Sequence, residues 1–178
     1  MDTVEQTLAN LLLWGKLEEL ALGLSLFDIL EYLGPPDNYS TVDNFLKDWP
    51  RLKASTGTKE IIAIDYAQLE LIFHKEDSKL ICFWLEPKRL VTTTLPGVLD
   101  DRLIGFISNM SITKFSEFAF KRTITCYLEY HSYKFPKVSL LCTQKSSVRI
   151  VFDLEDNADE LYAITKSVWM DNYWHLME

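Results

Sequence analysis

The sequence predicts an α+β protein made of two helix-plus-antiparallel-sheet units in tandem, with an N-terminal and a C-terminal helix. Two observations favour this class. Apolar residues recur at helical spacing in the first 34 residues, and runs rich in β-branched and aromatic residues follow from residue 61. The same order, helix and then strands, recurs after residue 105. With 48% hydrophobic and 13% aromatic residues, the 178-residue chain has ample apolar surface for a core.

The N-terminal helix is predicted from five leucines near helical spacing: Leu8, Leu11, Leu12, Leu20 and Leu22. Gly15 interrupts this pattern, and Gly23 is a candidate end because glycine readily adopts the left-handed conformation that closes a helix. A second, short helix follows.

Both ends of this second helix are marked in the sequence. Ser25 is a candidate N-cap, and Gly34 followed by two prolines is a stop signal. The expected buried face consists of Leu26, Ile29, Leu30 and Leu33.

Residues 37–60 are polar and show no clear period, so they are interpreted as a long insertion with one short helix over Val42–Trp49. Strands are predicted over Ile61–Ile64, Gln68–His74 and Lys79–Leu85, with a hairpin turn at residues 75–78. Residues 1–87 would thus form the N-terminal helix and first unit, ahead of a linker over 88–104.

Residues 105–178 are predicted to form the second unit. Ser111 caps its helix, strands follow over 122–133, 137–144 and 147–154, and a last helix covers 156–169. The repeat is suggested by the ungapped comparison of Leu69–Leu85 with Val138–Leu154, which has five identities in 17 positions.

The charge distribution indicates the class of partner. The net charge is −8 and the pI is about 4.9, which argues against nucleic-acid binding because phosphates would be repelled. Residues 1–50 hold nine acidic and two basic side chains, a net of −7, whereas the remaining residues have a net of −1. We therefore expect a basic protein partner, and no nucleic acid. The short apolar run near the N-terminus lacks a basic flank and is too short for a bilayer, so we expect a cytoplasmic protein and no membrane partner.

Patterns for catalysis, metals and cofactors are absent from the sequence. His74, His131 and His175 have no metal-ligand spacing, and no glycine-rich phosphate loop or nucleophile motif occurs. The three cysteines, Cys82, Cys126 and Cys142, lie in apolar strand-like runs and are interpreted as buried free thiols. We expect no metal, no cofactor and no enzymatic activity.

Aromatic residues beside carboxylates are the candidate partner-binding residues, because large aromatics rimmed by charge are typical interface anchors. The candidate set is Asp37, Tyr39, Asp43, Asp48 and Trp49, together with Glu18 and Glu19. Two structural alternatives stay open: Trp49 packs a loop onto the core, and the carboxylates only solubilise a helical surface. A partner would then use the sheet or the C-terminal residues 169–178.

The segments LSLFDILEYLGPPDNY and IDYAQLELIFHKEDSKLICFWL carry a family resemblance. A Gly-x-Ser-x-x-Asp-Ile/Val-Leu helix ends in Leu-Gly-x-Pro-Asp, and a hairpin follows whose first strand resembles Tyr-Gly-x-Leu-Glu-Leu-x-Phe. The pattern resembles small bacterial immunity-type and toxin-neighbourhood proteins, and the helix-then-hairpin order is similar to tandem-repeat inhibitors of the beta-lactamase-inhibitor type. The match spans about a third of the chain, and Ala67 stands where the pattern has glycine.

This resemblance implies binding rather than catalysis. Together with the charge, it predicts a cytoplasmic immunity protein that inhibits a cognate basic bacterial toxin, a nuclease being one such toxin, through an acidic aromatic-rich surface. Two alternatives are a secretion-type chaperone and a small enzyme with an unrecognised site. A dimer with a large apolar groove would favour the chaperone, and a pocket of converging polar groups would favour the enzyme.

Overall fold

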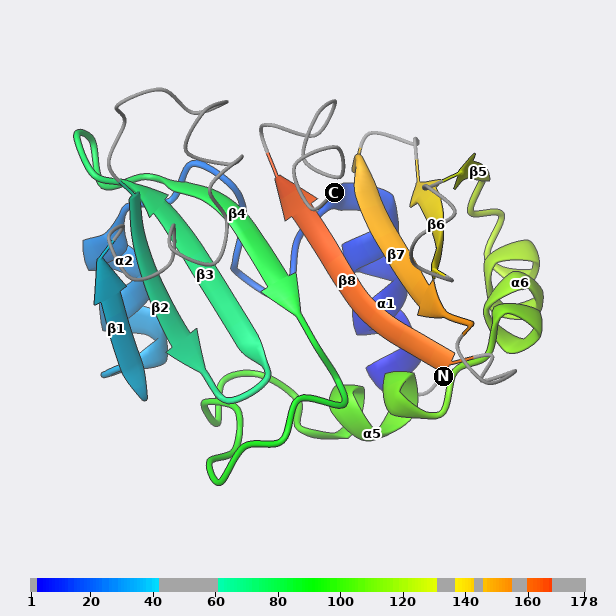
Figure 1. The fold of residues 1–178 in the computed structure, drawn as a ribbon, viewed down its shortest axis with the longest axis horizontal. Coiled ribbons are helices and arrows are strands. Elements are labelled where there is room, and N and C mark those ends of the chain that lie inside the picture. Colours follow the sequence, from blue (N-terminus) through cyan, green and yellow to red (C-terminus); the bar gives the residue numbers. More distant parts are fainter. Residues whose placement is uncertain (1–2, 42–60, 131–136, 143–145, 155–159, 168–178) are drawn as a thin grey trace.

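One twisted antiparallel sheet of eight strands, with helices α1 and α2 behind it in the view of Figure 1, organises the molecule. The computed structural model describes residues 3–41, 61–130, 137–142, 146–154 and 160–167. Its helices are α1 Thr3–Trp14, α2 Leu26–Leu33, α5 Arg102–Ser108 and α6 Ile112–Lys121. Its strands are β1 Asn38–Thr41, β2 Ile61–Tyr66, β3 Leu69–His74, β4 Leu80–Leu85, β5 Cys126–Tyr130, β6 Lys137–Cys142, β7 Val148–Asp153 and β8 Glu160–Ser167. The predicted α+β class is confirmed.

The strand order is β1-β2-β3-β4-β8-β7-β6-β5, and every pairing is antiparallel. The two meanders β1–β4 and β5–β8 therefore meet where β4 pairs with β8, in the middle of the sheet (Figure 1). Apolar side chains from the helices and one sheet face form the main core, in which Phe115 of α6 packs on Phe152 of β7 with ring centroids 5.8 Å apart. A smaller cluster of Ile61, Ala63, Ile72 and Cys82 is buried separately.

The helix caps read from the sequence are confirmed. Ser25 Oγ accepts a hydrogen bond from the Asp28 amide at 3.1 Å, and Ser111 Oγ accepts one from the Lys114 amide at 3.2 Å. Gly34 closes α2 with a φ of 82° and donates its amide to the Leu30 carbonyl. The expected apolar face is also present: Ile29 and Leu33 are buried, while Leu26 and Leu30 pack against the core and stay partly exposed.

Replacing either capping serine with alanine is expected to lower the free energy of unfolding by about 1 kcal/mol, because an amide at the helix start loses its acceptor. Urea unfolding of Ser25→Ala and Ser111→Ala measures this. A Ser116→Ala variant, changed at an exposed position inside α6, is the control. Equal midpoints for all three variants and the wild type would contradict a capping role.

Four sequence expectations need correction. The first helix ends at Gly15, which has a φ of 66°, and does not continue toward Gly23. The segment 37–60 was expected to hold no strand, but β1 lies within it. Helix α5 begins inside the expected linker 88–104. The helix expected over 156–169 is wrong for residues 160–167, which form β8 between β4 and β7.

The two halves of the chain have the same order of described elements, two helices followed by four strands. The ladders share a detail: the β3–β4 register shifts between Ile72 and Phe73, and the β7–β8 register shifts between Val151 and Phe152. Counting from the centre of the sheet, β3–β4 corresponds to β7–β8, whereas the ungapped sequence comparison aligned it with β6–β7. The tandem units themselves stay a prediction.

Among the described residues, no helix is both long enough and apolar enough to cross a membrane.

Candidate partner-binding site

Helix α2 is anchored to the sheet at both ends. At its start, the Leu26 amide donates to the Ser78 carbonyl at 2.7 Å, in the turn between β3 and β4. At its end, Tyr66 of β2 donates its hydroxyl to the Gly34 carbonyl at 2.7 Å. Burial raises the pKa of Tyr66 to about 12, and the charge of Asp37 adds to the rise, so this hydroxyl stays a donor at neutral pH. The outward face of α2 is thereby held in a fixed orientation.

That outward face combines an aromatic ring with two carboxylates. Phe27 is 73% exposed, and Asp28 and Glu31 beside it are exposed as well. The buried residues Ile29 and Leu33 lie on the other side of the helix. Sequence reasoning missed these three residues. The signal was available, because Phe27 lies off the apolar stripe and is therefore expected to face solvent.

Glu18 and Glu19 lie next to α2, in the connection from α1. Both are exposed, and Glu18 accepts a hydrogen bond from Thr7 Oγ1 at 2.8 Å. Burial raises the pKa of Tyr32 on α2; a hydrogen bond with the Glu19 backbone opposes the rise, and the charges of both glutamates add to it. The predicted pair thus lies near Tyr32 of α2. We call Glu18, Glu19, Phe27, Asp28 and Glu31 the α2 surface.

Asp37 joins three segments of the chain. Its Oδ2 accepts hydrogen bonds from the Ala67 amide at 2.7 Å and from Thr93 Oγ1 at 2.8 Å, and its own amide donates to the Asp65 carbonyl at 2.8 Å. Ala67, where the family pattern has glycine, has a φ of 52°, a conformation that glycine adopts without strain. The Asp37 carboxylate therefore links segments of the fold, although Asp37 is exposed and was predicted to contact a partner.

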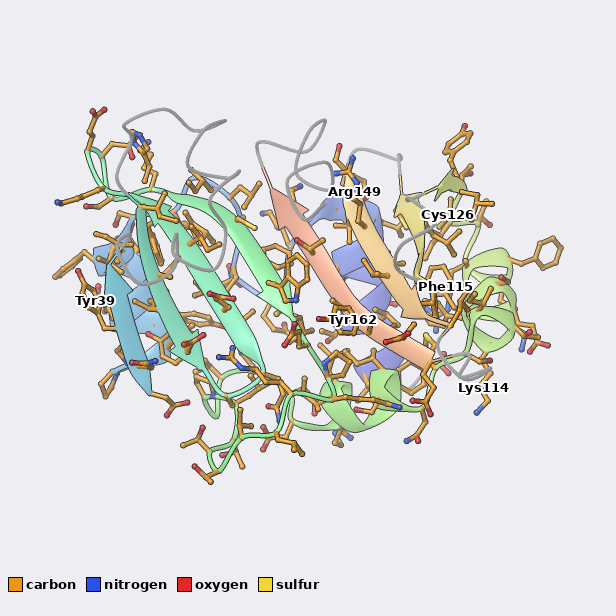
Figure 2. The ribbon with its side chains drawn as sticks, in the orientation of Figure 1. Tyr39, Lys114, Phe115, Cys126, Arg149 and Tyr162 are labelled. Atoms are coloured by element: carbon orange, nitrogen blue, oxygen red, sulfur yellow. The ribbon has the colours of Figure 1, made fainter. Side chains whose placement is uncertain are left out.

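Tyr39 lies on β1, at one end of the sheet order, and its side chain is 55% exposed (Figure 2). It follows α2 in the chain and adds an exposed aromatic residue on the edge strand of the sheet. The other three predicted residues, Asp43, Asp48 and Trp49, lie outside the described residues.

An open groove of about 500 Å³ adjoins Asp37. It is lined by Asp37, Asn38, Asp65, Ala67, Arg89, Leu90, Val91, Thr92 and Thr93. Its charged groups already have hydrogen-bond partners within the groove. Arg89 Nη1 donates to Asp65 Oδ1 at 3.0 Å, and Asp37 accepts hydrogen bonds from Ala67 and Thr93. Polar groups that are hydrogen-bonded to one another are typical of structural support. The groove is therefore weak support for the small-enzyme alternative, although its lining is polar.

A row of polar residues crosses five adjacent strands. Direct cross-strand partners lead from Asp65 to Glu70, then to Trp84, Thr165 and Arg149. Cross-strand partners point to the same sheet face, so this row lies on one side. Sequence reasoning missed it because it depends on the register of every strand.

Glu70 is a partly buried carboxylate in this row. Burial raises its pKa to about 7, and the charges of Asp65 and Glu86 add to the rise while Arg89 opposes it. Of the two cross-strand acids, Asp65 has an ion pair with Arg89 that neutralises its charge, whereas the charge of Glu70 is penalised by burial. Glu70 therefore changes its charge near neutral pH.

Possible metal ligands are scattered: within the described ranges, no three His, Cys, Asp or Glu side chains gather closely enough to hold an ion. Two cysteines that the sequence left separate do meet. Cys126 of β5 and Cys142 of β6 are direct cross-strand partners, with their Sγ atoms 3.0 Å apart.

No protein-family model matches this chain, and no curated protein or solved structure matches it. The functional proposal below therefore depends on the residues of the α2 surface and on the sequence pattern that includes this helix.

Proposed function

We propose that this protein is an immunity-type inhibitor that binds a basic protein toxin through the α2 surface. The observation that supports this most is Phe27, a phenylalanine 73% exposed between carboxylates on a helix anchored at both ends. An exposed aromatic ring in a rigid setting gains from burial against a partner and loses little conformational freedom.

The negative charge of the N-terminal segment predicts a positively charged partner. Residues 3–41 hold six acidic side chains and one basic side chain, a net of −5. Complementary charge accelerates encounter, and close interfacial charge pairs couple by about 1.5–7 kcal/mol in a well-studied inhibitor complex. The occluded surface of the toxin would accordingly be basic, as the active site of an enzyme that acts on nucleic acid is.

Helix α6 offers a natural comparison. It has an even more exposed ring, Phe120 at 87%, but its exposed charged residues, Lys114, Glu117 and Lys121, carry a net charge of +1, whereas those of α2 carry −2. The charge of the two helices therefore favours α2 over α6 as the docking site of a basic partner. Comparing variants of the two helices therefore tests whether binding needs acidic charge beside the ring or only an exposed aromatic ring.

Variants of α2 are expected to weaken binding in two distinguishable ways. Phe27→Ala should raise the dissociation rate about 30-fold, because truncating an interface anchor costs about 2 kcal/mol. Glu19→Lys with Glu31→Lys should slow association about tenfold and flatten its dependence on salt. Surface plasmon resonance at several salt concentrations, with the captured partner described below, measures both rates.

The matched controls lie on the opposite half of the protein. Phe120→Ala and the double variant Asp101→Lys with Glu117→Lys change an exposed phenylalanine and two exposed acidic residues, at the N-cap of α5 and on α6. They should bind as the wild type does. If the α6 variants weaken binding as much as the α2 variants, the assignment of the surface to α2 is wrong.

The partner itself is identified by capture from lysate of the native host on immobilised wild-type protein, with the Phe27→Ala and Glu19→Lys/Glu31→Lys protein as a negative bait. The proposal expects a basic protein that depends on the α2 surface, is toxic when expressed alone and is harmless when co-expressed with this chain. A specific partner that is acidic, or that keeps its toxicity in the complex, would refute the inhibitor role.

We also infer that the two halves are tandem units. The repeated order of elements, the serine caps of α2 and α6 and the matching register shifts in β3–β4 and β7–β8 support this. On this view the two units differ in the surface charge of their capped helices, and the first unit presents the acidic docking helix.

A further inference from the structure

We infer that Cys126 and Cys142 form a redox-active dithiol that is converted reversibly into a cross-strand disulfide by hydroperoxides. The site lies on β5 and β6, at the end of the sheet opposite Tyr39 (Figure 2). It is independent of the α2 surface and goes beyond the proposed inhibitor function.

The positions of the two cysteines suit a disulfide bond. Cys126 begins β5, Cys142 ends β6, and the two residues are direct antiparallel partners. Opposed residues on neighbouring strands have Cα atoms about 4.5–5.5 Å apart, within the range of about 4.4–6.8 Å that a disulfide spans. Their Sγ atoms are 3.0 Å apart in the free-thiol form, so the bond forms without rearrangement of the sheet.

Unequal environments give the two thiols different roles. Cys126 is half-buried, whereas Cys142 is fully buried. The hydrogen bond between the thiols lowers the pKa of Cys126 and raises the pKa of Cys142, and burial adds to the rise at Cys142. Cys126 is thus the accessible thiolate that reacts first, and Cys142 is the thiol that resolves the product.

The chemistry balances with a hydroperoxide as the oxidant. The Cys126 thiolate attacks the terminal peroxide oxygen, the O–O bond breaks, and Cys126 becomes a sulfenic acid as alkoxide or hydroxide leaves. Cys142 then attacks the Cys126 sulfur, the S–S bond forms, and the hydroxyl group departs with the thiol proton as water. The two cysteines lose two electrons and two protons. An organic hydroperoxide is reduced to an alcohol and one water, and hydrogen peroxide is reduced to two waters.

Cys82 provides an internal control. It is fully buried on β4, and its Sγ donates to the Phe83 carbonyl at 3.7 Å. Its Sγ also lies 4.0 Å from Thr165 Oγ1 of β8, whereas Cys126 and Cys142 are cross-strand partners on β5 and β6. It should therefore keep its thiol under conditions that oxidise the pair.

The test exposes the reduced, full-length protein to hydrogen peroxide, then alkylates the unfolded chain and maps the cysteines by mass spectrometry. We expect an intramolecular Cys126–Cys142 peptide cross-link, a mass loss of 2 Da, full reversal by dithiothreitol, and oxidation of Cys82 at least about tenfold slower. Because the loop between the two cysteines is closed, the oxidised protein should also melt several degrees higher than the reduced protein.

Single variants separate the two roles. In Cys142→Ser, Cys126 should stop at the sulfenic acid and be trapped by dimedone, whereas in Cys126→Ser the buried Cys142 should stay a thiol. Cys82→Ser should cross-link as the wild type does. Recovery of Cys126 and Cys142 as free thiols when Cys82 is oxidised, or oxidation of Cys126 only into intermolecular dimers, would overturn the inference.

Discussion

Replacing Ile29 with aspartate is expected to abolish cooperative folding at room temperature. Ile29 is 1% exposed and packs in the main core on the inner face of α2. Burying a carboxylate without a partner costs several kcal/mol, and the isoleucine contacts are lost as well, against a total stability of about 5–15 kcal/mol. Circular dichroism and size-exclusion chromatography should show loss of the melting transition and an expanded or aggregated chain.

Neighbouring positions on α2 provide graded controls for this prediction. Leu30 is only partly buried against the core, so Leu30→Asp should be destabilising but less so, even though the sequence alone placed it on the buried face. Phe27 is exposed, so Phe27→Asp should melt close to the wild type. Equal melting temperatures for Ile29→Asp and Phe27→Asp would show that the assigned inner face of α2 is incorrect.

Replacing Glu70 with glutamine is expected to stabilise the protein at pH 8 but not at pH 4.5. Its folded-state pKa is about 7 and its reference value is 4.5, so the folded state holds the proton more tightly across that window. Stability from this group is therefore greatest below pH 4.5, falls as the pH rises toward 7, and stays low above 7. The difference, 7 − 4.5 = 2.5, corresponds to a gain of up to about 3 kcal/mol for the neutral glutamine at pH 8.

Urea unfolding at pH 4.5, 6 and 8 measures this effect as the difference between Glu70→Gln and the wild type, which cancels the titration of groups that do not interact with Glu70. Glu117→Gln, changed on the exposed face of α6, is the matched control and should show little pH-dependent difference. A Glu70→Gln variant that is less stable than the wild type at pH 8 would mean that the carboxylate is stabilised by Arg89 more than it is penalised by burial.

The helix ends and the hairpin strands were predictable because their signals are local. A serine and the amide three residues later form an N-cap within one helical turn, as at Ser25 and Ser111. The apolar runs of β2, β3, β4 and β7 likewise carry strand-forming residues in each segment. Element type in these regions needed no information from distant parts of the chain.

The candidate site was predictable only in part. Glu18, Glu19 and Tyr39 are exposed as expected, since charge and a position beside loop signals favour exposure. Asp37 was expected to meet a partner, but its hydrogen bonds to Ala67 and Thr93 come from segments about 30 and 56 residues away. No local pattern encodes such a link, and the cysteine pair at β5–β6 was missed for the same reason.

Local signals in the sequence are sufficient for the α+β class, the N-terminal helix, the capped helices α2 and α6 and the strong acidity of the N-terminal segment, because each depends on residues a few positions apart or on composition. The strand at residues 160–167, in contrast, depends on long-range pairing. Acidic residues at 156–160 favour a helix start, yet residues 160–167 lie between β4 and β7, where both edges of the strand gain a hydrogen-bonded ladder. Tertiary pairing also aligned Asp65 with Glu70 and Cys126 with Cys142, since register across strands is a property of the whole sheet.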